Sequence, residues 1–232
     1  MSFRPHTTKT AAILVTLTAL LLAAATFAAL APAPAGAADA ASLRPKIVKK
    51  YIRFGDTRKA QTAKYSKRRY HQNTYRLTKP KAVVLHHTAG AYWQSAWNTF
   101  NANTAYGGEK PGVSAHFIIG KGGAIYQCMP LSLRGRHCVG MNWTSIGIEF
   151  VQEMRSGKDG HWMDRQILNR DKQIRAGLRL VRYLKARFGI RTTDVVGHAT
   201  ANRSRFFKDY TGQKNAAGDW YAAEVKIFRS RL

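Results

Sequence analysis

The chain has 232 residues, and its 38 Lys and Arg against 12 Asp and Glu give a formal net charge of +26 at pH 7. This length suits one domain of ordinary size with extensions. The charge predicts attraction to polyanions, such as nucleic acid, anionic lipid or acidic cell-wall polymers. Because no zinc-finger, RNA-recognition or basic-zipper pattern accompanies it, we expect no nucleic-acid partner.

Residues 1–38 have the layout of a secretory signal peptide. Arg4 and Lys9 supply the positive start, residues 11–31 are almost entirely apolar, and residues 31–37 end in an Ala-x-Ala pattern. An apolar segment of that length could also anchor the chain in a bilayer. The small, proline-containing end favours cleavage, so we expect a secreted, extracellular protein with no membrane span after cleavage.

Residues 39–79 are predicted to form a basic N-terminal arm. Fourteen Lys or Arg lie between Arg44 and Lys81, against the single carboxylate of Asp56. Interleaved aromatic residues could stack on bases or sugars. We favour a partly ordered arm that lays its aromatic side chains on the next domain, residues 80–232, while its charges face solvent.

The first element of that domain is a short buried strand at residues 83–85, followed by His86, His87 and a Thr-Ala-Gly turn. Histidine is seldom needed for packing, whereas neutral imidazole is a common zinc ligand. A pair of histidines, one hydrogen-bonded in the core and one on the surface, is the alternative interpretation.

The remaining elements alternate between helices and strands. Residues 92–104 carry aromatic residues at helical spacing, and residues 114–128 predict two strands joined by a Gly-rich turn at 121–123. A buried strand at 144–151 contains Glu149, a helix is expected from about Met163 to Phe188, and a strand at 194–198 ends in His198. Asp219 is predicted to cap a final helix. We expect a single α/β domain with a mixed central sheet flanked by helices. A disulfide between Cys128 and Cys138 is favoured, with two free buried thiols as the alternative.

Three polar residues, His86, Glu149 and His198, are candidates for a single functional site. His86 and His198 each end a buried strand, where sheet proteins commonly place ligand sites. Glu149 interrupts an apolar strand, and burying a carboxylate is costly unless it is paired, protonated or functional. Two histidines and an acid suit a catalytic zinc site, which needs three protein ligands and a carboxylate to move protons. A hydrogen-bonded polar core is the competing interpretation.

Four motifs in this order carry a resemblance to a known family: VVLHHTA at 83–89, SAHFIIGKGGAIYQ at 114–127, SIGIE at 145–149 and VVGH at 195–198. Together they resemble the zinc-dependent N-acetylmuramoyl-L-alanine amidases of the type-2 amidase and peptidoglycan-recognition-protein superfamily, over roughly residues 80–230. The resemblance implies one zinc ion in the domain, with His86 and His198 as ligands. It implies a third ligand in the following loop, where Asp209 is the only carboxylate or thiol before Gly212. It also implies that Glu149 is the general base.

The resemblance leaves some roles open. Many of these amidases have a lysine two positions before the third ligand, and here that position is Phe207; Lys208 is our candidate for the role, with Arg205 or a histidine as alternatives, unless the role is absent. His137, His116 and Tyr106 are candidate substrate contacts. The alternatives are structural hydrogen bonds for the histidines and packing for the tyrosine.

The expected function is therefore that of a secreted zinc hydrolase that cleaves peptidoglycan at the amide bond between N-acetylmuramic acid and the L-alanine of the stem peptide. Its charge would hold it on anionic cell-wall polymers. A non-catalytic module of the same fold that binds peptidoglycan is one alternative. A cationic adhesion or antimicrobial protein that acts through its charge is another.

Overall fold

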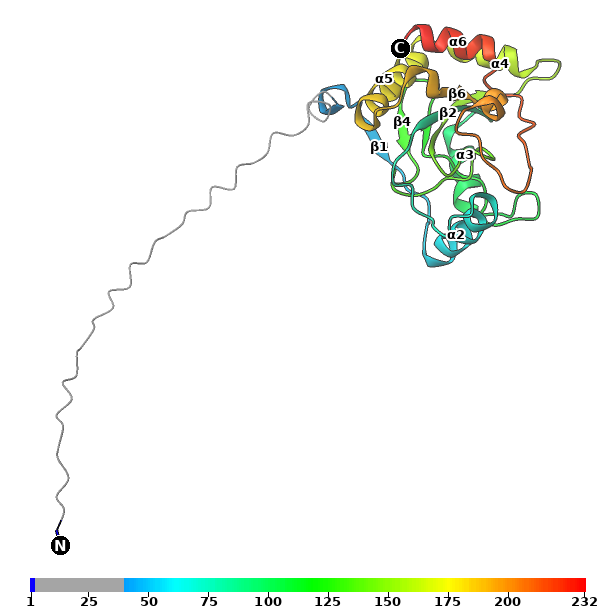
Figure 1. The fold of residues 1–232 in the computed structure, drawn as a ribbon. Helices are drawn as coiled ribbons and strands as arrows, with labels where there is room; N and C mark the ends of the chain where they lie inside the picture. The colour runs from blue at the N-terminus through cyan, green and yellow to red at the C-terminus, as the bar shows by residue number, and fades with distance from the viewer. Residues whose placement is uncertain (3–39) are drawn as a thin grey trace, which may run out of the picture. The chain divides into compact units, whose positions relative to one another are not determined.

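A six-stranded mixed β-sheet runs through the centre of the fold, with strand order β1-β4-β3-β5-β2-β6 (Figure 1). Its strands are β1 (Ile47–Lys49), β2 (Ala82–Ala89), β3 (Phe117–Ile119), β4 (Ile125–Gln127), β5 (Ser145–Glu153) and β6 (Val195–Gly197). Only β3 and β4 pair antiparallel, and every other neighbouring pair is parallel. The predicted hairpin and the predicted mixed sheet are both confirmed.

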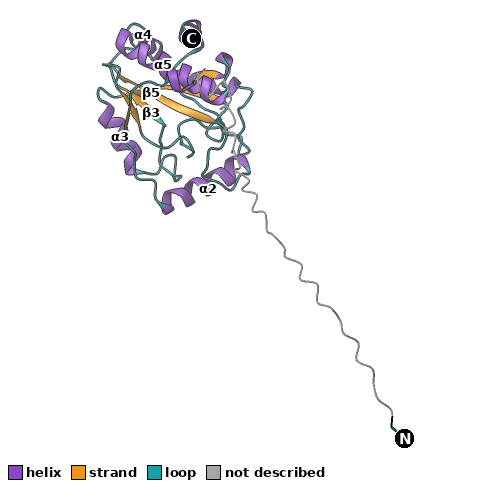
Figure 2. Cartoon of the chain, turned by 90° about the vertical axis from the view of Figure 1, so that its left-hand side faces the viewer, coloured by secondary structure: helices purple, strands orange, loops and turns teal. Residues whose placement is uncertain are grey.

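Helices cover both faces of this sheet, and Figure 2 shows α4 and α5 on one side of the strands and α2 and α3 on the other. Their bounds are α2 (Asp56–Tyr70), α3 (Trp93–Ala102), α4 (Gly160–Leu168), α5 (Asp171–Phe188) and α6 (Ala222–Ser230), with short 3-10 helices η1 (Thr192–Asp194) and η2 (His198–Arg203). The helix expected at 92–104 is therefore confirmed as α3.

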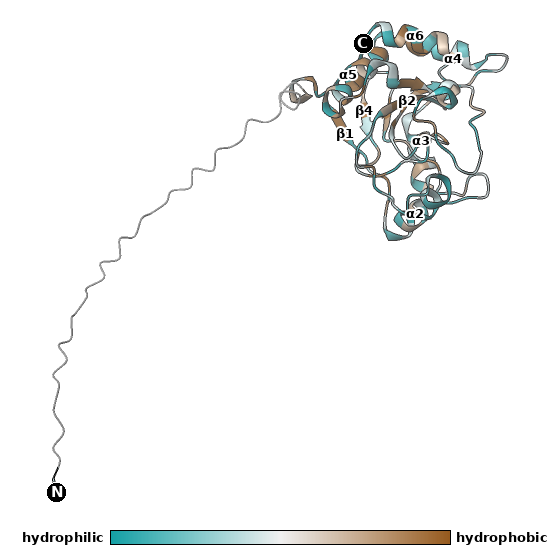
Figure 3. Cartoon of the chain, viewed as in Figure 1, coloured by the Kyte–Doolittle hydropathy of each residue, from teal (hydrophilic) through white to brown (hydrophobic). Residues whose placement is uncertain are grey.

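The two faces of the sheet bury different sets of residues, because successive side chains along a strand point to opposite faces. Val83 and Leu85 of β2 pack into the larger core cluster, together with residues of α4, α5 and α6. Val84 points the other way, into a smaller cluster with Met141. Hydrophobic residues are accordingly concentrated on β2 in Figure 3. His86 continues the Val84 face, and His87 continues the Leu85 face.

Residues of the expected arm are part of this architecture. Strand β1 forms the edge of the sheet beside β4, and helix α2 packs with Tyr65 and Tyr70 buried. The buried Arg58 guanidinium donates hydrogen bonds to the carbonyls of Phe100 and Gly112, at 2.6 and 3.3 Å. Residues 40–232 all fall within a single compact unit by their contacts.

Three expectations about local structure are wrong. The single helix expected to run to Phe188 is two helices, because Arg170 is extended and its side chain donates to Gln152 of β5 at 2.8 Å. Helix α6 begins at Ala222, with Tyr221 rather than Asp219 as its N-cap. Cys128 and Cys138 are free buried thiols, and they lie in separate core clusters.

The computed structural model describes residues 1–2 and 40–232. The predicted signal peptide lies almost wholly outside the described residues. No helix in the described residues is both long enough and apolar enough to cross a bilayer.

Candidate metal centre and active site

The pairing of β2 with β5 brings the first two site residues together. His86 of β2 lies directly opposite Glu149 of β5 in the parallel register. By the alternation along each strand, His86 shares the face of Val84 and Glu149 shares the face of Val151. Both side chains therefore project from the same face of the sheet, close to the middle of the adjacent strands β2 and β5.

A close approach of two backbone segments brings the next two residues to the same place. His198 follows β6, which pairs with β2 on its other side. A Cβ atom at Gly197 would lie 1.7 Å from the carbonyl oxygen of Trp220, so only glycine allows this contact. Trp220 has a φ of +54°, a conformation that residues other than glycine seldom adopt, and its indole Nε1 donates to the His86 carbonyl at 3.1 Å. These contacts hold the preceding residue, Asp219, against the histidines.

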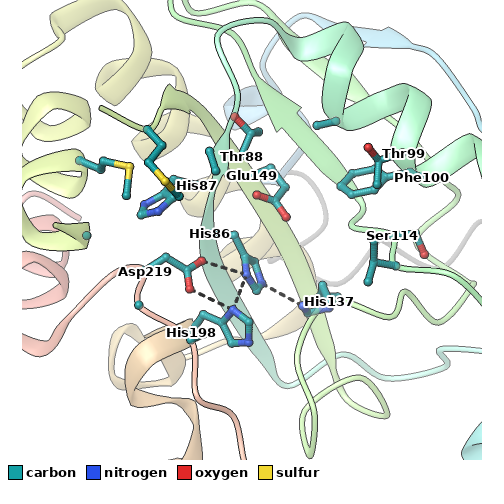
Figure 4. Close-up of a pocket in the computed structure, with 18 of the residues that line it drawn as sticks. His86, His87, Thr88, Thr99, Phe100, Ser114, His137, Glu149, His198 and Asp219 are labelled. Carbon is teal, nitrogen blue, oxygen red and sulfur yellow. Dashed lines mark hydrogen bonds and ion pairs between the residues drawn. The ribbon is translucent and has the colours of Figure 1, made fainter. Parts of the chain in front are cut away.

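His86, His198 and Asp219 form a tight cluster of potential ligand atoms (Figure 4). The two Nδ1 atoms are 3.1 Å apart. The Asp219 carboxylate lies 3.3 Å from Nδ1 of His86 and 3.0 Å from Nδ1 of His198, with one oxygen toward each ring. This is the only such group of three or more His, Cys, Asp or Glu residues within the described part of the chain.

These donors fit a zinc ion. Four-coordinate zinc with bonds of about 2.0 Å places neighbouring ligand atoms about 3.3 Å apart, close to the three separations measured here. Two imidazoles and one carboxylate are ligands that zinc accepts, and three of them leave a fourth position for water or substrate. The residues present therefore suit a catalytic rather than a structural metal site.

The pKa shifts within the cluster show that it favours a positive charge beside Asp219. Burial lowers the pKa of His198, but its hydrogen bonds with Asp219 and Cys138 outweigh this and raise the pKa to about 11. Burial and the neighbouring His198 lower the pKa of His86 to about 4. Burial raises the pKa of Asp219, yet hydrogen bonds with the two histidines hold it well below its usual range. The carboxylate thus stays ionised beside a proton that a metal cation would displace.

The Nε2 atoms of His86 and His198, which face away from Asp219, each contact another side chain. Nε2 of His86 lies 3.1 Å from Nδ1 of His137, and Nε2 of His198 lies 3.1 Å from Oδ1 of Asn215. Asn215 in turn donates to the carbonyl of Val139 at 2.9 Å. Such contacts fix the orientation and tautomer of a metal-binding histidine, and here they leave both Nδ1 atoms facing Asp219.

The cluster opens into a cavity of about 730 Å³ that also receives the Glu149 side chain. Burial, with a smaller contribution from the Asp219 charge, raises the pKa of Glu149 to about 8. A carboxyl group with a pKa near neutrality can both accept and return a proton under ordinary conditions. The far wall of the cavity comes from α3 and from the loop that contains Tyr106 and Val113.

Comparison with known proteins assigns the family. A sequence model described as N-acetylmuramoyl-L-alanine amidase matches residues 76–216, which is more than half of the chain. The chain belongs to this amidase family. Family membership covers β2 to β6 and η2 with the two histidines and Glu149, whereas β1, α2 and Asp219 lie outside the matched residues. No curated protein sequence that was compared matches the chain.

Solved structures with a similar fold include other amidases and a recognition protein. The chain is 21% identical to the N-acetylmuramoyl-L-alanine amidase LysC from Clostridium intestinale, with 79% of this chain and 96% of that chain covered at a TM-score of 0.49. A mutant endolysin from Bacillus subtilis is 24% identical, covering 67% and 85% at 0.45. The bumblebee protein PGRP-SA is 20% identical, covering 68% and 85% at 0.46.

The structure does not place Asp209 beside His86 and His198. Its buried carboxylate accepts a hydrogen bond from Arg69 of α2 at 3.2 Å and bonds to Thr211. Asp219, ten residues further along the chain, occupies the expected position instead. The expectation that Asp209 completes the cluster is thus corrected to Asp219.

Lys208 and Arg205, the candidates to replace the lysine that many of these amidases carry, also lie away from the histidines. The Lys208 Nζ lies 4.6 Å from the centre of the Tyr210 ring, and Arg205 pairs with Asp194. Neither side chain lines the cavity that contains Glu149. The residue two positions before Asp219 is Ala217, which does line it. Arg136 and Lys158 are the Lys or Arg side chains that line this cavity.

The three expected substrate contacts have different surroundings. His137 lines the cavity, and a Cβ at Gly147 would lie 2.6 Å from its ring, so that glycine leaves the space for it. Tyr106 is 65% exposed and lines the cavity rim. His116 is fully buried away from the cavity, with Nε2 2.9 Å from the Leu133 carbonyl and Nδ1 accepting from the Gly147 amide. These contacts agree with the alternative interpretation of His116, in which it forms structural hydrogen bonds.

Sequence reasoning missed Asp219, Asn215 and a second buried pair beside the site. His87 projects from the opposite face of β2 and its Nδ1 lies 3.0 Å from the buried Asp164 carboxylate of α4. Burial lowers the pKa of His87, but Asp164 outweighs this and the net shift is upward. Asp164 also accepts from the Tyr221 amide at 3.1 Å, so the pair fixes the chain just after Asp219. Its sequence signal was the second histidine of the HHT motif.

Proposed function

We propose that the protein is a zinc-dependent amidase that cleaves peptidoglycan between N-acetylmuramic acid and the L-alanine of the stem peptide. The observation that carries this proposal is the convergence of His86, His198 and Asp219 in the lining of a cavity that also holds Glu149. Membership of the amidase family supports the choice of substrate. In this proposal Asp219, rather than Asp209, is the third zinc ligand.

Zinc, when bound, supplies Lewis-acid polarisation of the scissile carbonyl and activation of water. The chain itself supplies the movement of protons. Glu149 takes a proton from the attacking water and delivers it to the amine of the departing L-alanine, so that the amide C–N bond breaks with no net change in the enzyme's protonation. A carboxyl group whose pKa lies near 8 before metal binding, and lower beside a cation, suits both transfers.

His137 and Asn215 act through the ligands and not on the substrate in this proposal. Each keeps the Nε2 side of one ligand histidine occupied, so that Nδ1 is presented to the metal. Tyr106 and Arg136 lie at the side of the cavity where an extended glycan or peptide would enter. Arg136 donates to the carbonyls of Tyr106 and Pro111, at 2.9 and 2.6 Å, and so holds that wall in place.

We also propose that the mature protein acts outside the cell, at the cell wall. The sequence pattern of residues 1–38 supports secretion, and the net charge of +26 supports attraction to anionic wall polymers.

The experiment that tests the function is mass spectrometry of the products formed from purified peptidoglycan, with and without a zinc chelator. We expect stem peptides with free L-alanine amino termini, and we expect them to disappear on chelation and return with added zinc. Intact peptidoglycan that binds the protein without any release of peptide would instead favour a recognition module of the same fold.

A further inference from the structure

A second charged cavity lies at the free edge of the sheet, away from the metal centre. It measures about 350 Å³ and is lined by residues of η1, β6, η2 and α6 and by residues that adjoin η1 and η2. Four arginines line it: Arg191, Arg203, Arg205 and Arg229. We call this cavity the arginine groove. It shares none of its lining residues with the cavity that contains Glu149.

Two of the arginines are held in fixed positions by one carboxylate. Arg205 donates Nε and Nη2 to the two oxygens of Asp194, at 3.0 and 2.9 Å. Arg191 donates to the same oxygens at 3.4 and 2.9 Å. The Asp194 side chain is only 6% exposed, whereas the two arginine side chains are more than half exposed. Each guanidinium therefore keeps N–H groups that face solvent.

The other two arginines differ in their contacts. Arg229 donates to the carbonyls of Val195 and Thr193, at 2.6 and 2.7 Å, and so covers the free edge of β6 without neutralising its own charge. Arg203 is exposed, and its side chain has no hydrogen bond or ion pair with any residue from 40 to 232. Among the lining residues Asp194 is the only acid, so four positive charges face one negative charge.

This arrangement suits phosphate better than it suits a folded protein surface. Guanidinium groups bind phosphate oxygens through pairs of parallel hydrogen bonds, and groups that are already positioned lose less entropy on binding. The lining also offers the hydroxyls of Thr193, Thr200 and Ser204. No aromatic side chain lines the groove, so it offers no surface on which a nucleic-acid base could stack.

We infer that the arginine groove binds the phosphodiester groups of a polyol phosphate chain, with the hydroxyl side chains facing the polyol. The choice of a wall polymer over other phosphodiesters rests on the proposed function. Binding at this edge would hold the protein on the wall while the cavity with Glu149 remains free for peptidoglycan. Arg203 supplies a guanidinium group that is free to bind phosphate. Arg191, Arg205 and Arg229, whose positions are fixed by their hydrogen bonds, supply the positive surface around it.

The test measures the affinity of the protein for soluble poly(glycerol phosphate) at about 0.15 M salt, by fluorescence anisotropy of a labelled chain. Arg203→Gln should weaken binding about tenfold, the effect of losing one charge-assisted pair of hydrogen bonds. The matched control is Arg179→Gln, which removes the same charge from an exposed arginine on α5 outside the groove. We expect less than a twofold change there. Arg203→Lys, which keeps the charge and loses the planar fork, should give an intermediate loss.

Three results would overturn the inference. Equal losses in Arg203→Gln and Arg179→Gln would assign binding to net charge alone. Equal loss of binding to single-stranded DNA in Arg203→Gln would mean that the groove does not select polyol phosphate. Equal loss of binding to poly-glutamate would mean that it does not select phosphate. The assay needs no turnover, so a protein that fails to cleave peptidoglycan but shows the expected pattern would refute the amidase proposal and leave the groove standing.

Discussion

Asp209 and Asp219 lie in the same connection between η2 and α6, and the two carboxylates have opposite surroundings. Asp209 pairs with Arg69 of α2 and with Thr211. Asp219 faces His86 and His198, with one oxygen toward each ring. The first carboxylate ties the N-terminal helix to the domain, and the second belongs to the group of residues that we propose as the zinc site. The comparison teaches that the chemistry of a buried acid is set by what the fold places opposite it.

The partners of the two acids also differ in how they hold charge. Arginine is always protonated, so Asp209 has a permanent positive partner inside the protein and does not need a metal. His198 beside Asp219 holds a proton that can be exchanged for a metal ion, because neutral imidazole is itself a ligand. The predictions below separate these two roles.

Replacing Asp219 should have the largest effect. In Asp219→Ala we expect zinc to be lost on dialysis and amide cleavage to fall at least about a thousandfold, because two histidines alone do not hold a catalytic zinc. Zinc content by atomic emission and release of stem peptide measure the two effects. A variant that keeps zinc and full activity would mean that the third ligand is elsewhere.

Glu149→Gln should keep zinc and lose turnover. General acid–base groups contribute about a hundredfold to ten-thousandfold to rate, so kcat should fall by that range. The matched control is Glu153→Gln, which changes an acid of the same strand that pairs with Lys121 outside the cavity. An equal rate in the Glu149 variant and the control would remove Glu149 from the mechanism.

Asn215→Ala should weaken zinc binding without abolishing it. Loss of the acceptor behind His198 frees the ring, and such losses cost about 10- to 100-fold in metal affinity. Asn215→Asp, which keeps an oxygen in the same position, should restore most of the affinity. Competition with a zinc-binding dye gives the constants. A variant of unchanged affinity would show that Asn215 does not position His198.

The stability of chelator-treated protein should depend on pH through Glu149. Its pKa in the fold is about 8 against an ordinary value of 4.5, so the folded state holds this proton more tightly than the unfolded state. Stability from this group is therefore full below about pH 4.5 and lost as the pH rises through 8. Glu149→Gln removes this pH dependence. His198 and Asp219 titrate both in this variant and in the unchanged protein, so the difference between the two stability curves reports on Glu149. The difference in unfolding free energy should reach about 2 kcal/mol or more. Parallel stability curves would contradict it.

Asp209→Ala should have the smallest effect on catalysis. Zinc content and kcat should stay within about twofold of the unchanged protein, because the carboxylate does not line the cavity. Stability should fall by about 1–3 kcal/mol, since Arg69 loses a partner in a buried position and keeps only Glu109 and Thr211. Chemical denaturation with zinc present measures this. Loss of zinc from this variant would reverse the roles of the two acids.

Much of the site could be predicted because it depends on strands. A polar residue that interrupts or directly follows an apolar strand is easily recognised in the sequence. The alternation of side chains then places His86 and Glu149 on one face of the sheet. His198 follows by the same pattern. Asp219 could not be found in this way, since its position depends on the close approach of Gly197 to Trp220, two segments with no shared periodicity. An aspartate just before a helical segment has the same sequence pattern whether it caps the helix or binds a metal.

The N-terminal helix was hidden for a different reason. Helix α2 buries Arg58, Thr62, Ser66 and Arg69, which are polar residues at helical spacing. A hydrophobic pattern does not reveal such a helix, because the two buried arginines depend on partners far along the chain: the Phe100 carbonyl for Arg58 and the Asp209 carboxylate for Arg69. The division between α4 and α5 likewise depends on the contact of Arg170 with β5. Local patterns predict elements well where burial is apolar and poorly where it is polar.

The measurement that tests the central claim most directly is a crystal structure of the zinc-loaded protein with anomalous diffraction at the zinc edge. The account predicts one strong peak bonded to Nδ1 of His86, Nδ1 of His198 and the Asp219 carboxylate, with Asp209 still paired to Arg69. A zinc peak bonded to Asp209, or a protein that takes up no zinc beside Asp219, would contradict it.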